Sequence, residues 1–379
     1  MTRNGSQTFR ADHVGSLLRP PEVLQAHAAH AEQRISAKQL RDIEDEAILK
    51  ALQLQHEVGL DVLSDGEYRR SSWSGDFASA VDGYVPGSPP IAFEWQTRQG
   101  PRTPEVRAAL QTISGRVIGE RLRQRRRLTA HESGFLLHHV NAACKITMPA
   151  PSYIVARGYQ PGISDKVYKT RADVLADVVA ILRAEVQALV AEGVPYIQLD
   201  NPHYPDYIPE DRRAQWRSIG IDPDAALQED IAADNACLEG VDRARVTLAM
   251  HICRGNSRSA WHTQGGYEPI AEQVFDSLQV DRFLLEYDSE RAGGFEPLRF
   301  VTRGKLVVLG LITTKQGELE SQDVLRKRID EAARHVPLEH LALSPQCGFA
   351  SVQEGNLLSW DEQRRKLELV VDTARRVWG

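Results

Sequence analysis

Three apolar stretches in the second half of the chain end at residues that can bind a transition metal. His251 and Cys253 continue or directly follow the apolar run at residues 246–250. Residues two apart in a strand point to the same face, so both side chains can reach one ion. Glu286 closes a second apolar run, and Cys347 lies shortly after a third. One imidazole, two thiols and one carboxylate suit Zn²⁺, so the sequence predicts a zinc site made of these four residues.

The competing interpretation of these residues is structural. A free cysteine is most often a small buried hydrophobic residue, and a lone His-x-Cys pair is weak evidence for a metal. Glu286 and Cys347, which can also bind a metal and lie at equivalent strand ends, favour the metal site. The ligands are also far apart in the sequence, unlike those of small structural zinc modules, which indicates a site assembled by the whole fold. Cys144 lies before the end of its strand and Cys237 lies on a helix, so both are predicted to be packing residues.

A zinc ion that holds two thiolates is electron-rich and therefore a poor acid for activating water. It is better suited to binding a substrate thiol and lowering its pKa, which makes a thiolate nucleophile available at neutral pH. Glu67 and Asp200, at other strand exits, suit the ammonium group of such a thiol. The turn Gly15-Ser16 offers N–H groups and a hydroxyl to a carboxylate. Homocysteine, an amino-acid thiol, satisfies these features together.

The polar residues at strand exits are candidates for substrate binding or catalysis. The sequence predicts Ser16, Glu67 and Asp200 as substrate-binding residues, and Asp200, His203 and Lys315 as catalytic residues. Several have a structural alternative. Glu67 and Asp200 could cap helices or pair with arginines, and Ser16 could be an N-cap. His203 could be a solvated loop residue.

Short apolar runs alternate with amphipathic helical patterns over most of the chain. The predicted strands lie near residues 10, 62, 146, 198, 248, 284, 308 and 342. Such alternation requires parallel strands with crossover helices. Eight units predict an α/β fold of the (β/α)8 TIM-barrel type, with its chemistry at the C-terminal ends of the strands. A doubly wound sheet would carry a glycine-rich phosphate loop after its first strand, and residues 14–17 do not form one.

The barrel is predicted to span residues 1–379 as one domain, with an irregular insertion at residues 71–143 after the second strand. The insertion is rich in glycine, proline and serine, and its arginine-rich stretch at residues 116–127 is interpreted as the solvated face of a strand pair. Helices are predicted at residues 36–58, 171–191, 223–238, 269–278, 295–301, 322–335 and 360–377. Ser36 is the predicted N-cap of the first, and Gly59 its C-terminal stop.

The composition bounds the class of protein. The chain has 379 residues and a net charge of −6, which argues against nucleic acid or an anionic membrane as its main partner. No apolar run approaches the length of a membrane span, and the N-terminal residues lack the apolar core of a signal peptide. Four cysteines in so long a chain do not make a disulfide framework. These observations predict a cytoplasmic protein, and a homo-oligomer is left open.

Several of these segments resemble the cobalamin-independent methionine synthase family, in the short single-barrel form of its catalytic domain. The matching segments are residues 10–16 (RADHVGS), 65–70 (DGEYRR), 197–200 (IQLD), 251–256 (HICRGN), 285–288 (LEYD) and 344–349 (SPQCGF). The resemblance implies zinc-dependent methyl transfer to homocysteine, which gives methionine. By this resemblance the zinc ligands are His251, Cys253, Glu286 and Cys347. Glu67 and Asp200 would contact the amine of homocysteine, and Ser16 would contact its carboxylate.

The sequence departs from the family pattern in two places. Full-length members carry a second, N-terminal barrel that helps to hold folate, and this chain has none. The family's catalytic histidine after the seventh strand is missing, because residues 310–315 read GLITTK. The alkyl donor is therefore left open among folate, a methylcorrinoid protein, an epoxide and other donors.

Three other functions remain open from the sequence. The short form also resembles epoxyalkane:coenzyme M transferases, in which a zinc-bound thiolate opens an epoxide. Coenzyme M ends in a sulfonate, so this alternative predicts a cationic pocket, with Arg19, Arg69 and Lys315 as candidates. A decarboxylase of the uroporphyrinogen type would need no metal. A zinc-stabilised binding module without catalysis would have a closed metal site with no displaceable ligand.

Overall fold

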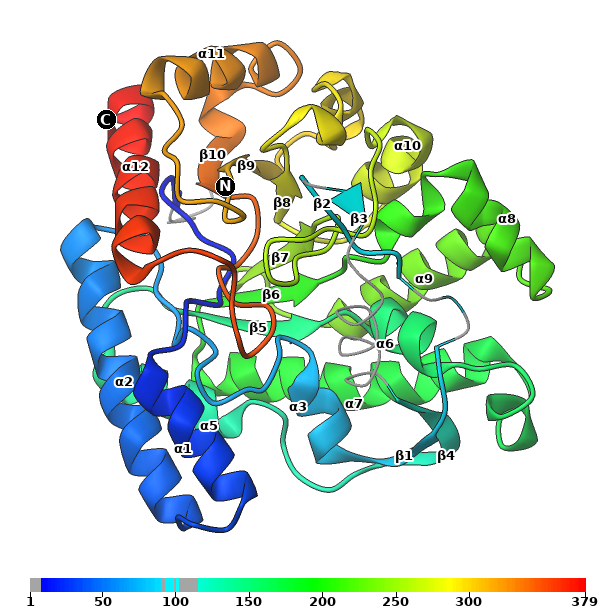
Figure 1. The fold of residues 1–379 in the computed structure, drawn as a ribbon. Helices are drawn as coiled ribbons and strands as arrows, with labels where there is room; N and C mark the ends of the chain where they lie inside the picture. The colour runs from blue at the N-terminus through cyan, green and yellow to red at the C-terminus, as the bar shows by residue number, and fades with distance from the viewer. Residues whose placement is uncertain (1–7, 90, 92, 99, 102–114) are drawn as a thin grey trace.

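A parallel β-sheet occupies the centre of the computed structural model, which describes residues 8–89, 91, 93–98, 100–101 and 115–379. Six strands are neighbours in the order β10-β9-β8-β7-β6-β5, and all run parallel. They are β5 Lys145–Pro149, β6 Tyr196–Asp200, β7 Thr247–Ile252, β8 Arg282–Glu286, β9 Leu306–Ile312 and β10 Leu341–Pro345. Helices surround these strands (Figure 1), as crossover connections between parallel strands require.

Two extended segments near the N-terminus close the ring between β10 and β5. Ala11 forms a parallel bridge with Leu343 of β10, and Leu63 forms one with Cys144. The amide of Asp61 donates to the carbonyl of Ala11 at 3.1 Å, which joins the two segments. The six strands and the two bridged segments together form the eight-membered ring of a (β/α)8 barrel, as predicted. The two N-terminal strands are reduced to bridges, because the Asp61 carboxylate accepts the backbone amide of Ala11 that a longer ladder would use.

The strands are buried on both faces, which is typical of a parallel sheet covered by helices. In β9, Val307 and Leu309 belong to the large apolar layer that also contains helix residues. Leu306 and Val308 belong to a smaller apolar cluster made almost entirely of strand residues. Since neighbouring residues of a strand point to opposite faces, the smaller cluster fills the interior of the barrel.

The helices begin and end where capping residues predict. α2 (Ala37–Val58) starts with a capping box at Ser36 and ends at Gly59, whose φ of 86° is left-handed, as predicted. Further α-helices in the described part of the chain are α1 Pro21–Ala31, α3 Gly75–Ala80, α5 Ala130–His139, α6 Pro151–Gly158, α7 Arg171–Glu192, α8 Glu210–Ser218, α9 Pro223–Leu238, α10 Glu268–Ser277, α11 Gln322–Ala332 and α12 Trp360–Trp378. The helix predicted at residues 295–301 is a short 3₁₀-helix, Glu296–Phe300. None of the helices described here is both long and apolar enough to cross a membrane.

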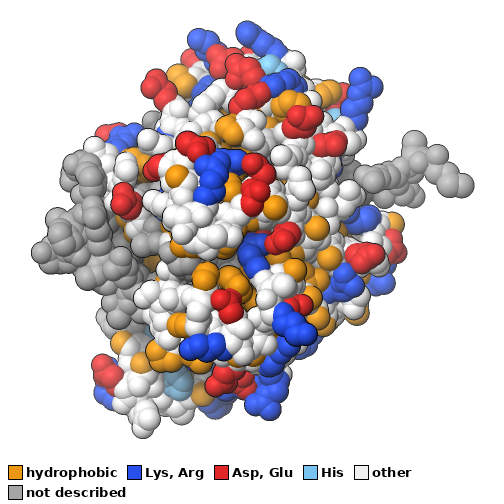
Figure 2. Space-filling model, turned by 90° about the vertical axis from the view of Figure 1, so that its right-hand side faces the viewer, with side chains coloured by type: hydrophobic (Ala, Val, Ile, Leu, Met, Phe, Trp, Pro, Cys, Tyr) orange, Lys and Arg blue, Asp and Glu red, His pale blue; other side chains and the backbone are white. Residues whose placement is uncertain are grey.

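The predicted strand pair is present in the segment at residues 71–143. β1 (Val81–Pro86) pairs antiparallel with β4 (Arg116–Gln124). Arg123 and Arg125 form ion pairs with Asp82 at 3.0 and 2.9 Å, and both arginines are exposed. The arginine-rich stretch is therefore solvated, as interpreted from the sequence. On the face shown in Figure 2, positive and negative side chains are interspersed.

The same segment also reaches the C-terminal ends of the barrel strands. β2 (Gln96–Thr97) pairs with β3 (Gly100–Pro101). Gln96 forms a further bridge with Trp261, which lies in the loop between β7 and α10. This contact brings residues 93–97 over the end of the barrel where the site residues are predicted.

Candidate functional site

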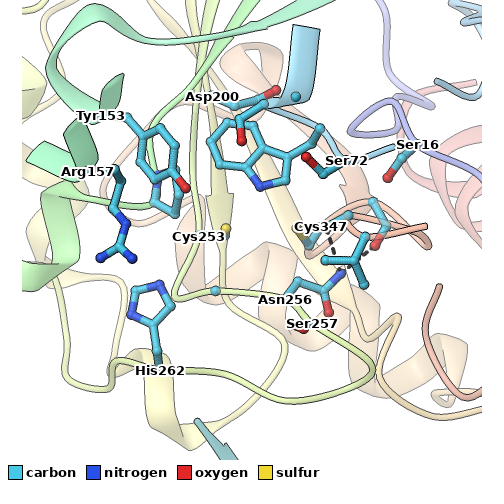
Figure 3. Close-up of a pocket in the computed structure, with 18 of the residues that line it drawn as sticks. Ser16, Ser72, Tyr153, Arg157, Asp200, Cys253, Asn256, Ser257, His262 and Cys347 are labelled. Atoms are coloured by element: carbon cyan, nitrogen blue, oxygen red, sulfur yellow. Dashed lines mark hydrogen bonds between the residues drawn. The ribbon is translucent and has the colours of Figure 1, made fainter. Parts of the chain in front are cut away.

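Three of the four predicted metal ligands converge at the ends of two strands. His251 lies in β7, Cys253 follows that strand directly, and Cys347 follows β10. One ligand atom from each of the three residues lies within 4.8 Å of the other two, and all three residues are buried. This group, called the metal trio below, lies in the wall of a cavity (Figure 3).

The imidazole of His251 is oriented as that of a metal ligand. Its Nδ1 lies 3.1 Å from the carbonyl oxygen of Leu284 on β8, so Nδ1 carries a proton and Nε2 is the nitrogen left to bind a metal. Nε2 is buried and has no hydrogen-bond partner among the described residues. One unpartnered nitrogen beside two thiols is a donor set that fits Zn²⁺.

The two thiols of the trio stabilise one negative charge between them. The pKa of Cys347 lies well below its usual range, because the Cys253 thiol donates a hydrogen bond to it and His251 and Lys315 lie nearby. The same hydrogen bond, together with burial, raises the pKa of Cys253. Metal ligation requires the thiolate form, so one of the two sulfurs already favours the form that binds a cation.

Glu286 lies at the end of β8 but outside the metal trio. One of its carboxylate oxygens accepts the amide of Arg254 at 2.6 Å, and the other pairs with Arg291 at 2.5 Å. Burial favours a raised pKa for Glu286, but the charges of Lys315, Arg291 and Arg254 outweigh it and lower the pKa to about 2. Glu286 is therefore an ionised carboxylate in a salt bridge, and its role as the fourth ligand stays a prediction that requires it to change partners.

Two buried carboxylates, Glu67 and Asp200, line the cavity beside the trio. Asp200 ends β6 in register with His251 on β7, and burial raises its pKa to about 7. Burial also raises the pKa of Glu67. The Oε1 atom of Glu67 accepts the Thr147 hydroxyl at 2.8 Å, whereas Oε2 has no partner among the described residues. Leaving a buried carboxylate oxygen without a donor is costly, and a ligand ammonium group would supply that donor.

The backbone that carries Glu67 is strained. Its φ of 60° lies in the left-handed region, which residues other than glycine seldom adopt. Backbone strain of this kind is frequent at functional sites. A Cβ atom at Gly15 would lie 2.8 Å from Thr147 and 3.0 Å from the Glu67 carboxylate. Because position 15 is a glycine, the turn Gly15-Ser16 can approach the Glu67 carboxylate closely.

Ser16 lies on the cavity wall beside the loop that carries Cys347. Its hydroxyl accepts the amide of Ala350 at 3.3 Å. A Cβ atom at Gly348 would lie 2.0 Å from the same hydroxyl oxygen. The serine is thus held close to the metal trio, where it can contact a small ligand.

His203 does not line the cavity. It is buried, so the alternative interpretation as a solvated loop residue is wrong. Its Nδ1 lies 3.2 Å from Asp206, and its Nε2 lies 3.1 Å from the Tyr207 hydroxyl and 3.3 Å from Asp230. Both ring nitrogens are therefore engaged in a buried network, and the predicted catalytic role of His203 has no geometric support.

Lys315 is also set back from the cavity wall. Its ammonium group lies 3.3 Å from the carbonyl oxygen of Gly255 and 3.4 Å from the side-chain oxygen of Asn256. Its charge contributes to the lowered pKa values of Cys347 and Glu286. Lys315 therefore acts on the trio through space.

The other two cations considered for a sulfonate are engaged in the fold. The Arg19 guanidinium donates to the carbonyl oxygens of Glu67 and Arg70, each at 2.8 Å. Arg69 pairs with Glu44 and with Asp45. Neither arginine lines the cavity.

An aromatic end of the cavity was not foreseen from the sequence. Phe93, Trp95, Arg157 and His262 form it, and they are called the outer compartment below. The His262 ring stacks on Phe93 with 3.9 Å between centroids, and the Arg157 guanidinium lies 3.9 Å from the centre of the same ring. Arg157 and His262 lie at one end of the cavity and Ser16 at the other (Figure 3). The whole cavity has a volume of about 410 Å³, which suits small molecules.

A family model and related sequences match nearly the whole chain. The model of a family described as "Cobalamin-independent synthase, Catalytic domain" matches residues 9–376. The uncharacterized protein YxjH of Bacillus subtilis is 39% identical over 98% of this chain and 95% of its own length. A methionine synthase of Sulfurisphaera tokodaii is 23% identical over 89% of this chain and 84% of its own length.

Solved structures are similar over nearly the whole chain. A protein of Listeria monocytogenes, described as a candidate vitamin-B12-independent methionine synthase, has a TM-score of 0.69 at 32% identity, with 98% of each chain covered. A B12-independent methionine synthase of Shewanella sp. W3-18-1, in complex with selenomethionine, has a TM-score of 0.69 at 20% identity, with 97% of each chain covered. The second likeness concerns the fold alone, and together they confirm the predicted barrel class.

Proposed function

Because the chain belongs to the cobalamin-independent methionine synthase family, whose catalytic-domain model spans residues 9–376, we propose that it is a zinc-dependent enzyme that methylates homocysteine and so produces methionine. The methyltransferase class follows from the family. The metal and the thiol are our proposal, and they rest on the residues of the cavity.

One observation carries the proposal: the unpartnered Nε2 of His251 and the two thiols of the trio lie beside an unpartnered oxygen of Glu67. A zinc ion bound there would supply a substrate thiolate at neutral pH by lowering the pKa of the thiol. Glu67 and Asp200 would accept the ammonium group of homocysteine, and Ser16 would contact its carboxylate. Glu286, released from Arg291, would complete the ligand set.

The alternatives have less support from the contacts. The coenzyme M alternative requires a cation beside the thiol site. Arg19 and Arg69 are engaged in the fold, and Lys315 contacts Gly255 and Asn256 outside the cavity lining. Arg157 lies at the opposite end of the cavity from Ser16. A metal-free decarboxylase would leave Nε2 of His251 buried without a partner, which costs free energy. A binding module with a closed metal site would not need a cavity that opens onto the trio.

Proton release tests the proposed thiol. Homocysteine added to the zinc-loaded protein at pH 7 in weak buffer should release about one proton per chain, because the bound thiol becomes a thiolate. Methyl iodide, a small uncharged electrophile, should then convert the bound homocysteine to methionine faster than it converts free homocysteine. Proton release by coenzyme M and none by homocysteine would favour the alternative enzyme, and release by neither would contradict zinc-dependent thiol activation.

A further inference from the structure

Arg157 is a half-buried cation on α6 that forms no ion pair with a carboxylate of the described residues. Its Nη1 donates to the carbonyl oxygen of Ile91 at 3.0 Å, and its guanidinium lies over the Phe93 ring. Partial burial lowers its pKa, because it removes part of the water around the charge. A cation kept from water without an anion costs free energy, so a ligand anion would stabilise this arrangement.

Asp206 acts on Arg157 through its charge but forms no ion pair with it. The oxygens of Asp206 are taken by other donors. One oxygen lies 3.2 Å from Nδ1 of His203, and the other accepts the Thr263 hydroxyl at 2.9 Å. Arg212 adds a second positive charge that acts on Arg157. Arg157 therefore presents a guanidinium to the cavity without an ion pair to any carboxylate of the described residues.

The position of Arg157 separates it from the predicted thiol site. Ser16, Glu67 and Asp200 can bind both charged groups of an amino-acid thiol without it. In Figure 3, Arg157 lies across the cavity from Ser16, on the far side of Cys253. Arg157 is therefore placed to contact a second ligand, at the end of the cavity opposite to the one predicted to bind the amino-acid part of the thiol.

The walls beside Arg157 suit a flat ligand. Phe93 and Trp95 contact each other and the His262 ring with centroid distances of 3.9 to 5.8 Å. Trp73 and Tyr153, also on the cavity wall, lie 4.6 Å apart between ring centroids. Aromatic walls favour stacked or edge-on ring partners.

We propose that the outer compartment binds an anionic group of the methyl donor, with Arg157 as its ionic partner and the rings of Phe93 and Trp95 against its flat part. The donor is then a small molecule with a carboxylate, sulfonate or phosphate beside a planar group. That this ligand is the methyl donor rests on the proposed function, whereas the anion site itself does not.

A binding experiment tests the anion site without any turnover. Benzoate and its uncharged counterpart benzamide are titrated into the zinc-loaded protein, and tryptophan fluorescence is followed, since Trp73 and Trp95 line the cavity. Arg157→Gln should weaken benzoate binding about 10-fold or more, which is typical for the loss of a charge-assisted hydrogen bond, and should leave benzamide binding unchanged. Arg157→Lys should restore most of the affinity for benzoate.

The matched control is Arg116→Gln, an exposed arginine on β4 that lies near a Tyr84 ring but lines no part of the cavity. It should change neither titration. Equal weakening of benzoate and benzamide by Arg157→Gln, or undiminished benzoate binding, would overturn the anion site.

A pair of methyl esters connects the site to methyl transfer. Methyl 4-carboxybenzenesulfonate and methyl benzenesulfonate serve as methyl donors with and without a carboxylate. The sulfur of homocysteine attacks the methyl carbon of either ester and forms the S–CH3 bond. The CH3–O bond breaks, and its electron pair leaves on the sulfonate oxygen. Arg157→Gln should lower kcat/KM about 10-fold for the carboxylate ester only. If neither ester methylates homocysteine in the unaltered protein while benzoate still depends on Arg157, the proposed function fails and the anion site stands. Equal losses with both esters would overturn the assignment of this anion to the donor.

Discussion

The two ends of the cavity are built from different kinds of structure. At the metal end, His251 and Cys347 belong to the ends of parallel strands or the residues directly after them, and the strand ladders hold their backbones. At the outer compartment, Phe93 comes from the insertion, Arg157 from α6 and His262 from a loop. Rigid strand ends suit chemistry that needs ligand atoms in fixed positions, whereas connecting segments suit recognition.

The two ends also differ in charge. The metal end gathers thiols and carboxylates, and an unpartnered oxygen of Glu67 faces that region. The outer compartment gathers a guanidinium and an imidazole among aromatic rings. Because the two ends of the cavity carry opposite charges, each of two substrates can bind in one orientation. The ammonium group of one substrate would lie at the metal end, and the anionic group of the other in the outer compartment. The following substitutions would break or sharpen this contrast.

The largest effect is expected from the metal end. Cys253→Ala should lower zinc affinity by more than about 100-fold, because a direct ligand is lost, and even partners of ligands are worth about 10- to 100-fold. Methyl transfer should be lost with the metal. Metal analysis after dialysis measures the loss, and far-UV circular dichroism should be unchanged because the barrel core does not include this thiol.

Cys237→Ala is the matched control for that experiment. Cys237 is buried in the apolar layer between helices and strands and has no metal-binding partner within the described residues, so its loss should leave the zinc content intact. One tightly held zinc per chain in Cys253→Ala would show that the ligand assignment is wrong.

The next effect concerns the ammonium site. Glu67→Gln should raise KM for homocysteine by about 10- to 100-fold, because a hydrogen bond to a charged group is worth about 1.5–3 kcal/mol. Zinc content should be unaffected. Steady-state kinetics with 4-mercaptobutanoate, which lacks the amine, provides the control, and an equal rise in KM for both thiols would argue against ammonium binding by Glu67.

A smaller effect is expected in the outer compartment. Phe93→Leu removes the ring that contacts both Arg157 and His262, and about 1 kcal/mol of cation–π and stacking energy should be lost, or about 5-fold in donor KM. KM for homocysteine and zinc content should stay the same. A loss of zinc in this variant would mean that the two ends of the cavity are not independent.

The smallest effect is expected outside the cavity. Arg123→Gln removes an exposed ion pair with Asp82 on the strand pair of the insertion. Exposed ion pairs contribute little, so the free energy of unfolding should change by no more than about 0.5 kcal/mol, and neither KM should move. Chemical denaturation and kinetics measure both, and a marked change in donor KM would place β4 in the recognition surface.

Most of the barrel could be predicted from local pattern alone. Parallel strands covered on both faces are continuous apolar runs in sequence, and helix ends carry caps such as Ser36 and Gly59. The N-terminal strands shrink to bridges because the Asp61 side chain replaces part of the ladder, which no local pattern reveals. The predicted helices also did not include α6, which opens with Pro151 at its first position shortly after the strand predicted near residue 146.

By itself the sequence determined the chemistry that is available: thiols, an imidazole and carboxylates directly after apolar runs, whose strand ends must meet in a barrel. Only the tertiary structure decided how these groups are used. It places Glu286 in a salt bridge with Arg291 and encloses His203 in a buried network. It also assembles Phe93, Arg157 and His262 into one compartment. The physical reason is that hydrogen-bond partners and ring contacts come from segments distant in the sequence, so they exist only once the chain has folded.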